Sequence, residues 1–227
     1  MIKQGDSALY DQLARLTKAI SSPRRLELVD LLAQGERPVE ELAGLTGMSV
    51  ANTSRHLQAL KAGRLVAVRR SGLYAFYRLA DAGVFTLWQA VRDLGERRLA
   101  SMRELVTMRF ADREKQPAVG LDELAEGLRS GGMVIVDTRP ESEFLAGHIA
   151  GALGVPLEEL EARLHVLPME QEVIACSRGP YCDLADRAVS LLRAQGYRTR
   201  RFALGFPDWR AAGLPSEGAI DRPMAGS

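Results

Sequence analysis

The second half of the chain alternates apolar runs with helical segments, and this alternation restricts the fold more than any other feature of the sequence. The expected elements, in chain order, are helix 121–128, strand 133–137, helix 141–146, helix 157–164, strand 173–175, helix 183–194, strand 199–203 and helix 207–212. Alternating strands and helices predict a parallel sheet that helices cover on both faces. Ligands of such sheets bind at the carboxyl ends of the strands.

One of these strand ends carries both cysteines of the chain. The segment Ile174–Cys182 is predicted to be a buried strand that runs into a glycine-containing loop, and a helix then begins near Asp183. The N–H groups of such a loop and the N-terminus of the following helix both stabilise negative charge. We therefore expect a thiol here to favour its thiolate form. Two cysteines this close make a poor structural staple, which indicates a reducing, cytoplasmic setting.

The first half of the chain has a different pattern. The expected elements are helices Leu9–Ile20, Pro23–Ala33, Pro38–Ala43 and Val50–Ala62, a β-hairpin over 65–79, and a long helix Ala82–Phe110. Two helices joined by a tight glycine turn, followed by a basic hairpin, predict a winged helix-turn-helix. The residues expected to contact DNA are Ser49, Asn52, Ser54, Arg55, Gln58, Arg69 and Arg70. The long helix is too apolar for a lone surface helix, so we expect a partner subunit to cover part of it.

The two halves of the chain differ in their balance of charged residues. Residues 1–110 hold 17 Lys and Arg against 11 Asp and Glu, whereas residues 111–227 hold 13 against 18. The basic balance indicates a polyanionic partner for the first half only. No apolar run reaches the ~20 residues of a membrane span, and the N-terminus lacks a signal-peptide pattern. We therefore expect no association with a membrane.

The segments Leu16–Leu26, Met48–Leu60 and Gly63–Val66 resemble the ArsR family of dimeric bacterial repressors. The resemblance implies a winged-helix homodimer that binds a two-fold-symmetric, double-stranded operator and is released by an inducer. Metal-sensing members carry cysteines in the helix equivalent to Val39–Leu45, or His and acidic residues in the last helix. This chain has no cysteine in the first of these places and no His or Cys in the second. We therefore expect a DNA reader with no metal site and no cofactor.

The second half resembles a rhodanese domain. The motifs that carry this resemblance are Asp137–Phe144, Gly147–Ala152, Pro156 with Leu157, residues 173–182, Trp209 and Gly213–Pro215. The resemblance implies sulfurtransferase chemistry, in which a loop cysteine accepts sulfane sulfur from thiosulfate, a polysulfide or a persulfide. Arg178 is expected to bind the anionic donor in a loop with Gly179, Pro180 and Tyr181. Arg139 matches a motif position and either joins this loop or holds the turn that contains it.

The nucleophile has two interpretations. Rhodanese-like regulators of this build usually read Ala-Tyr-Cys-Arg-Gly-Pro-Tyr-Cys, and a gapless alignment places Ser177 at the nucleophilic cysteine. The chain would then carry a Ser-for-Cys exchange, natural or introduced, and be inactive as an enzyme. A loop one residue longer makes Cys176 the nucleophile instead. We favour the gapless alignment. Cys182 is either a resolving or second sulfur-carrying thiol or a small buried residue at the start of a helix.

These patterns together predict two domains. Residues 1–110 form a mainly α-helical winged helix-turn-helix, residues 111–117 a linker, and residues 118–227 an α/β rhodanese-like domain with a parallel sheet. The first hypothesis is a DNA-binding repressor whose rhodanese domain senses or carries sulfane sulfur through a loop cysteine. The alternatives are a sulfurtransferase with an accessory DNA-binding domain and a catalytically inert rhodanese module for interactions.

Overall fold

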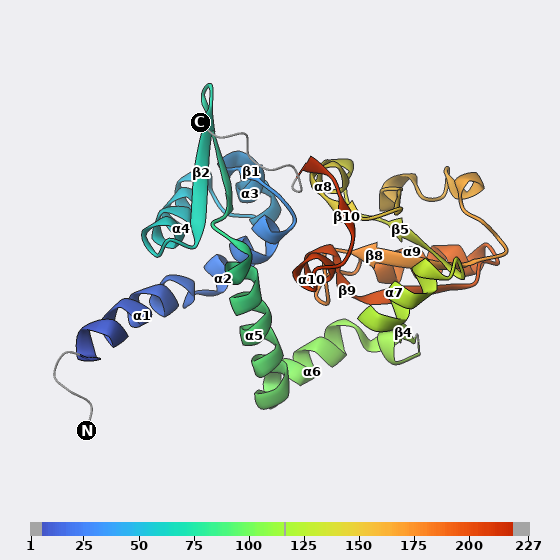
Figure 1. The fold of residues 1–227 in the computed structure, drawn as a ribbon, viewed down its shortest axis with the longest axis horizontal. Coiled ribbons are helices and arrows are strands. Elements are labelled where there is room, and N and C mark those ends of the chain that lie inside the picture. The colour runs from blue at the N-terminus through green and yellow to red at the C-terminus, as the bar shows by residue number, and fades with distance from the viewer. Residues whose placement is uncertain (1–5, 116, 220–227) are drawn as a thin grey trace. The chain divides into compact units, whose positions relative to one another are not determined.

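The computed structural model describes residues 6–115 and 117–219, and the chain divides into two compact units (Figure 1). The first unit is Met1–Asp93 and the second is Leu94–Ser227. The division falls inside one continuous helix, α5 (Ala82–Arg98). Each unit has its own buried core, and each is described separately below.

The first unit is a winged helix-turn-helix, as the sequence predicts. Its other elements are α1 (Asp6–Ile20), α2 (Pro23–Ala33), β1 (Arg37–Pro38), α3 (Val39–Thr46), α4 (Val50–Ala62), β2 (Val66–Ser71) and β3 (Tyr74–Leu79). The predicted bounds of α2 and α4 are confirmed. Pro at the start of α2 and the Ser49 cap of α4 are local signals that fix where a helix begins. The predicted hairpin gains a third strand, because β1 pairs with β3.

The turn between α3 and α4 requires a glycine. Gly47 ends α3 with a φ of 65°, a left-handed backbone conformation that residues with a Cβ atom rarely adopt. The Ser49 side chain then accepts a hydrogen bond from the Asn52 backbone N–H at 3.3 Å. Buried leucines from three helices form the core beneath this turn, namely Leu28, Leu32, Leu42, Leu57 and Leu60. The turn and this core fix the direction of α4.

The long helix expected over Ala82–Phe110 is two helices, so that prediction is wrong. The chain leaves the helical conformation at Leu99 (φ −101°, ψ 107°) and forms a second helix, α6 (Ala100–Arg109). A helix that ends leaves backbone carbonyls without partners. The Arg103 side chain donates to two of these carbonyls, those of Glu96 at 3.1 Å and Arg97 at 3.0 Å. This side chain compensates for the break between α5 and α6. After α6, the 3-10 helix η1 (Ala111–Lys115) covers most of the expected linker.

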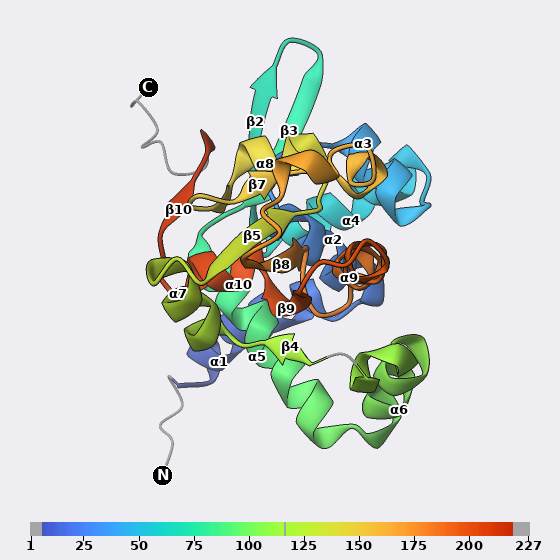
Figure 2. The same ribbon diagram turned by 90° about the vertical axis from the view of Figure 1, so that its right-hand side faces the viewer.

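The second unit contains the predicted parallel sheet (Figure 2). Its strand order is β4 (Ala118–Val119), β9 (Thr199–Gly205), β8 (Glu172–Ser177), β5 (Met133–Asp137) and β7 (Leu153–Gly154), and every pair is parallel. A separate two-stranded sheet joins β6 (His148–Ile149) to β10 (Ser216–Glu217). The helices are α7 (Leu121–Arg129), α8 (Glu141–Ala146), α9 (Leu184–Ala194) and α10 (Phe206–Ala211). The helix predicted over 157–164 is absent, and two short 3-10 turns, η2 (Leu157–Glu159) and η3 (Leu164–Val166), stand there instead.

Two apolar cores lie on the two faces of this sheet. Val173 and Ala175 of β8 face a cluster that includes Ala188 and Leu192 of α9. The alternate residues Ile174 and Cys176 face the other cluster, with residues of α7 and α10. Successive side chains of a strand point to opposite faces, so a strand buried on both faces is apolar throughout. No described helix is long and apolar enough to cross a membrane.

Candidate functional site

The carboxyl end of β8 is the centre of the candidate site. The strand is longer than predicted and ends at Ser177, so Cys176 and Ser177 both belong to the strand and not to the loop. Both side chains are enclosed, with Cys176 1% exposed and Ser177 2% exposed. The loop that follows consists of residues 178–183, and α9 begins at Leu184.

Cys176 does not have the thiolate-stabilising surroundings that the sequence led us to expect. Its burial raises the pKa of the thiol far above its usual value, and the neighbouring Asp137 carboxylate raises it further. The Arg139 guanidinium and the Phe206 backbone N–H oppose this shift but do not cancel it. Cys176 is therefore a neutral core thiol as it lies here, because its side chain faces the apolar cluster and not the loop amides.

The turn after β5 supports the end of β8. Thr138 donates two hydrogen bonds to the Cys176 carbonyl, from its backbone N–H at 3.1 Å and its Oγ1 at 2.8 Å. Arg139 is 0% exposed and forms an ion pair with Asp137, with Nη2 2.6 Å from Oδ2. The same Nη2 donates to the Gly147 carbonyl at 2.7 Å. Arg139 is thus enclosed and bonded within the turn that contains it, and its place in the substrate loop stays a prediction.

Arg178 is the first residue of the loop and is held by α8. Its Nε and Nη2 donate to the buried Glu143 carboxylate at 2.8 and 2.6 Å. Burial disfavours the charged guanidinium, but the hydrogen bond and charge of Glu143 outweigh this. The pKa of Arg178 is therefore raised. Since Glu143 already compensates this positive charge, an anion at this loop would have to share the Arg178 guanidinium with Glu143.

The backbone of the loop packs tightly against the start of α10. Gly179 has a φ of 153°, which favours glycine. A Cβ atom at Gly205 would lie 2.3 Å from the Arg178 carbonyl oxygen and 2.7 Å from the Gly179 nitrogen. Asp208 holds the Gly205 backbone in place, because its Oδ2 accepts a hydrogen bond from the Gly205 N–H at 3.1 Å. A glycine at 205 is therefore required for the loop to approach β9.

Cys182 lies at the far end of the loop and is half-buried, with a free thiol. Its N–H donates to the Gly179 carbonyl at 3.1 Å, and its own carbonyl accepts from Arg113 Nη2 at 2.7 Å. Arg113 also donates to the Pro180 carbonyl and pairs with Asp186 at 2.6 Å. Tyr181 Oη donates to Glu96 Oε1 at 2.6 Å.

Neither Arg113 nor Glu96 stood out in the sequence. Each lies at least 67 residues from its loop partner, and no motif joins them. The charged stretch that begins at Ala111 reads as a linker because its charges show no apolar periodicity. The structure shows that one of these charged residues, Arg113, binds the loop.

The predicted DNA contacts on α4 lie together on its polar face. Ser49, Arg55 and Gln58 are exposed, while Asn52 and Ser54 are half-buried. Asn52 Oδ1 accepts from Arg55 Nη2 at 2.6 Å. Gln58 Nε2 donates to the Tyr77 hydroxyl of β3 at 3.2 Å, which ties this face of α4 to the hairpin.

The two hairpin arginines predicted to contact DNA differ in their surroundings. Arg69 pairs with Glu36 at 2.6 Å and lies over the Phe76 ring, 4.7 Å from its centroid. Arg70 is exposed one residue further along β2. Arg69 must therefore share its charge between Glu36 and any phosphate.

Among the described residues, no group of three or more His, Cys, Asp or Glu side chains is placed to hold a metal ion. His56 of α4 belongs to no such group. Partial burial lowers the pKa of its imidazole, and Arg25, Arg55 and Arg24 lower it further, so the ring is neutral at pH 7.

A winged helix-turn-helix joined to a parallel sheet with a thiol-bearing loop defines a transcription factor with an appended rhodanese-like unit, and family comparisons match both parts. The family model described as "Bacterial regulatory protein, arsR family" matches residues 22–68. The model "Rhodanese-like domain" matches residues 120–212. Both resemblances stated from the sequence are thereby confirmed.

Individual relatives give the same assignment over the whole chain. The HTH-type transcriptional regulator Rv0324 of Mycobacterium tuberculosis is 42% identical over 216 residues, which cover 94% of each chain. This chain therefore belongs to the ArsR-type helix-turn-helix transcriptional regulators that carry a rhodanese-like domain. The human thiosulfate:glutathione sulfurtransferase is 32% identical over 106 residues, or 41% of this chain and 92% of that protein.

A solved structure resembles the first unit. It is the solution NMR structure of the homodimeric winged helix-turn-helix DNA-binding domain (fragment 1–100) of Mb0332 from Mycobacterium bovis. The two are 44% identical over 44% of this chain and 94% of that fragment, with a TM-score of 0.41.

Proposed function

We propose that this regulator is a homodimeric repressor that binds a two-fold-symmetric operator and responds to sulfane sulfur through Cys182. The observation that carries the sulfur part is the contrast between the two cysteines. Cys176 is 1% exposed and its pKa is raised by burial, whereas Cys182 lies on the loop and is only half-buried. A hydroxyl at Ser177 forms no persulfide, so Cys182 is the thiol within reach of a donor.

The proposed reaction is a thiol–polysulfide exchange. The sulfur atom of Cys182 attacks the terminal sulfur of a polysulfide, an S–S bond to Cys182 forms, and one S–S bond of the donor breaks. The departing fragment, shorter by one sulfur, takes the electron pair of the broken bond and the thiol proton. The product is a Cys182 persulfide anion, and no external oxidant is consumed.

The DNA part of the proposal assigns base and phosphate contacts to the polar face of α4 and to the hairpin. A recognition helix of this type lies in the major groove, with its first residues at the base edges. Arg55 and Gln58 are exposed long side chains of this face, and Arg70 is an exposed arginine of β2. The division proposed for the whole chain is a DNA reader over residues 1–110, a connector over 111–117 and a rhodanese-like domain over 118–227.

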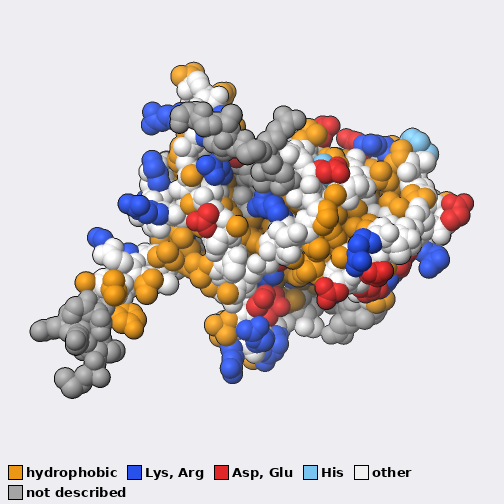
Figure 3. Space-filling model, in the orientation of Figure 1, with side chains coloured by type: hydrophobic (Ala, Val, Ile, Leu, Met, Phe, Trp, Pro, Cys, Tyr) orange, Lys and Arg blue, Asp and Glu red, His pale blue; other side chains and the backbone are white. Residues whose placement is uncertain are grey.

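The proposed dimer contact uses α1. Leu9, Tyr10 and Leu13 of this helix are more than 60% exposed, and apolar side chains gather along it in Figure 3. Apolar side chains this exposed on one helix mark an interaction surface. Because two copies of one chain read the two halves of a two-fold-symmetric operator, a second copy of this chain is the partner that we propose for this surface.

The test combines intact mass with operator binding. Polysulfide is expected to add the mass of one or more sulfur atoms to the wild-type chain and to Cys176→Ser, and none to Cys182→Ser. Operator affinity, measured by fluorescence anisotropy, is expected to fall on treatment in the first two proteins only. Sulfur addition to Cys182→Ser, or operator affinity that no sulfur donor changes, would contradict the proposal.

A second candidate function is sulfur transfer to a small thiol. It is favoured by the likeness to a protein named thiosulfate:glutathione sulfurtransferase. Turnover of thiosulfate with glutathione by the wild-type chain, together with operator affinity that does not respond to donors, would favour this function over regulation.

A further inference from the structure

We propose that a change in the loop of residues 178–183 is transmitted to the end of α5 through Tyr181 and Arg113. A change at Cys182 then reaches the helix that enters the DNA-binding unit. This inference rests on the proposed function and adds the route by which the loop acts. We call the contacts of Tyr181 with Glu96 and of Arg113 with the loop the loop–connector link. All of its residues belong to the second unit.

Three consecutive loop residues take part in this link. The carbonyls of Pro180 and Cys182 accept hydrogen bonds from the Arg113 guanidinium, and the hydroxyl of Tyr181 between them donates to Glu96. The residue that bears the thiol is therefore itself bonded to the connector. A change in the backbone at Cys182 alters the Arg113 contact directly.

Arg113 is firmly placed. Its side chain is mostly buried, it pairs with Asp186 of α9 at 2.6 Å, and its guanidinium lies over the Phe110 ring, 3.6 Å from the centroid. Arg201 also lies near this carboxylate, with its Nε 3.5 Å from Asp186 Oδ1. Two guanidinium groups thus share one carboxylate beside the loop. Charge-assisted hydrogen bonds of this kind are stronger than neutral ones.

A persulfide at Cys182 adds a sulfur atom and a negative charge to the residue whose carbonyl accepts from Arg113. The added anion competes with the Pro180 and Cys182 carbonyls for Arg113. The loop then rearranges, and the Tyr181 hydroxyl leaves Glu96 or changes its angle to it. A ligand shifts an equilibrium only through interactions that differ between two states, and this competition supplies the difference.

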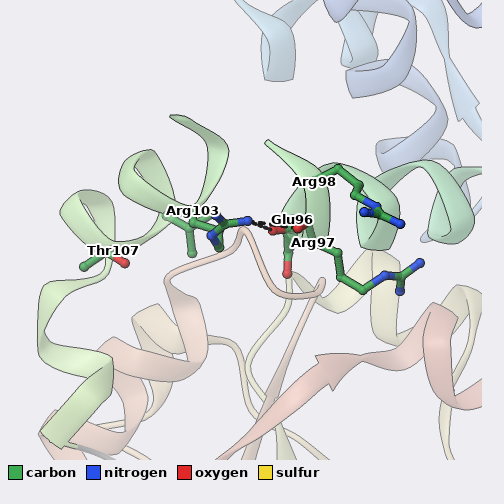
Figure 4. Close-up of a pocket in the computed structure, with 6 residues that line it drawn as sticks. Glu96, Arg97, Arg98, Arg103 and Thr107 are labelled. Atoms are coloured by element: carbon green, nitrogen blue, oxygen red, sulfur yellow. Dashed lines mark hydrogen bonds between the residues drawn. The ribbon is translucent and has the colours of Figure 1, made fainter. Parts of the chain in front are cut away.

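The other end of the link is the last turn of α5. Glu96 lies in the last turn of α5, and the corner between α5 and α6 is closed by Arg103, which donates to the Glu96 and Arg97 carbonyls (Figure 4). The same helix buries Phe85 and Trp88 in the first unit, and Trp88 Nε1 donates to Asp30 of α2 at 2.9 Å. A contact at one end of α5 is therefore connected through a continuous helix to the core beneath the DNA reader.

The test separates sulfur loading from the response of DNA binding. Tyr181→Phe removes the hydroxyl that reaches Glu96, and Arg113→Gln removes the charge that holds the loop carbonyls. Both variants are expected to gain sulfur at Cys182 by intact mass, as the wild-type chain does. The change in operator affinity on polysulfide treatment, expected to be about fivefold or more in the wild type, is expected to fall below twofold in both variants.

Matched controls come from the same unit. Tyr197→Phe removes a tyrosine hydroxyl that donates to the Leu164 carbonyl, and Arg163→Gln removes an exposed arginine paired with Glu159. Both controls are expected to respond as the wild type does. Glu96→Gln keeps an oxygen acceptor for Tyr181 and is expected to retain most of the response.

The outcomes distinguish this inference from the proposed function. A wild-type chain that gains no sulfur, or whose operator affinity never changes, contradicts both. A wild-type chain that responds, with Tyr181→Phe and Arg113→Gln responding equally, overturns the link and leaves the sulfur response standing. Loss of the response in the two variants but not in the controls supports the link.

Discussion

At the scale of single residues, the end of β8 places two neighbouring side chains, Cys176 and Ser177, in different surroundings. Ser177 and Cys176 are adjacent. Cys176 packs into the apolar cluster with residues of α7 and α10, whereas Ser177 is the last residue of β8, where the pairing with β9 shifts register. The hydroxyl is at the strand terminus where the gapless alignment expects a nucleophile, and the thiol is in the core. If position 177 is the nucleophile position, as the gapless alignment predicts, the thiol of this chain is displaced from it by one residue.

Restoring a thiol at the strand end tests this interpretation. Ser177→Cys is expected to raise thiocyanate production from thiosulfate and cyanide by about tenfold or more over the wild type, since it supplies a covalent acceptor. Ser177→Ala, which removes the hydroxyl without adding a thiol, is the control. No increase for Ser177→Cys in a folded protein would show that position 177 is not the nucleophile site.

The ion pair of Glu172 with Arg200 makes a second prediction at this scale. The hydrogen bond from Arg200 lowers the pKa of Glu172 below its ordinary value, against the opposing effect of burial. The stabilisation is complete above the unfolded-state pKa of about 4.3, and it is lost as the pH falls through the lower folded-state value. Solvent screening keeps it at about 1 kcal/mol or less.

Urea denaturation at pH 7 and at pH 3 measures this contribution. Glu172→Gln is expected to be less stable than the wild type at pH 7, and the gap is expected to narrow at pH 3. Glu159→Gln removes a carboxylate of an exposed pair and serves as the control. An equal gap at both pH values would mean that the pair does not contribute through its charge.

At the scale of elements, the sequence predicts best where a local signal is sufficient. Ser22 with Pro23 and the Ser49 cap mark the starts of α2 and α4, and both bounds are confirmed. Leu99 itself is neither glycine nor proline, and a side chain four residues later, Arg103, satisfies carbonyls freed by the break. Sequence periodicity alone does not contain that contact.

The candidate site was predictable to the same extent. The strand end, the loop and the residues Arg178 and Cys182 follow from strand–helix alternation and from motifs that lie close in sequence. The extension of β8 through Ser177 depends on pairing with β5 and β9, whose partners lie far along the chain. The Arg113 and Glu96 contacts with the loop depend on the tertiary fold, and no signal in the sequence identifies them.

The contact between the loop and β9 supports a prediction for these elements. Gly205→Ala places a Cβ against backbone atoms of Arg178, which cannot rotate away as a side chain can. We expect a loss of about 1–3 kcal/mol in unfolding free energy and slower sulfur loading of Cys182. Gly120→Ala has open space around the added methyl and is the matched control. A Gly205→Ala protein as stable as this control would contradict the close packing.

At the scale of the whole molecule, the proposed function depends on a second copy of the chain. A recognition helix that reads one half-site gains affinity for a two-fold-symmetric operator only when a second copy reads the other half-site. In each copy, α5 joins the winged unit to the loop–connector link. Under the proposed link, a change at one loop acts on one half-site, and the dimer combines the two.

Replacing Leu9 and Leu13 of α1 by glutamate tests the dimer and its role in DNA binding together. These side chains are 66% and 61% exposed and lie outside the core, so the substitutions are expected to leave the fold intact, as judged by circular dichroism. Charge placed in an apolar contact between copies disfavours association. Light scattering is expected to show a monomer, and operator affinity is expected to fall by about tenfold or more, as for the loss of one half-site.

Substitution of the neighbouring exposed polar residue, Gln12→Glu, is the control, because it adds a charge to the same helix without removing an apolar side chain. This variant is expected to remain dimeric. A double glutamate variant that is still a dimer would show that the copies associate through other surfaces. A monomer that binds the full operator as tightly as the wild type would contradict the dimeric reading of DNA.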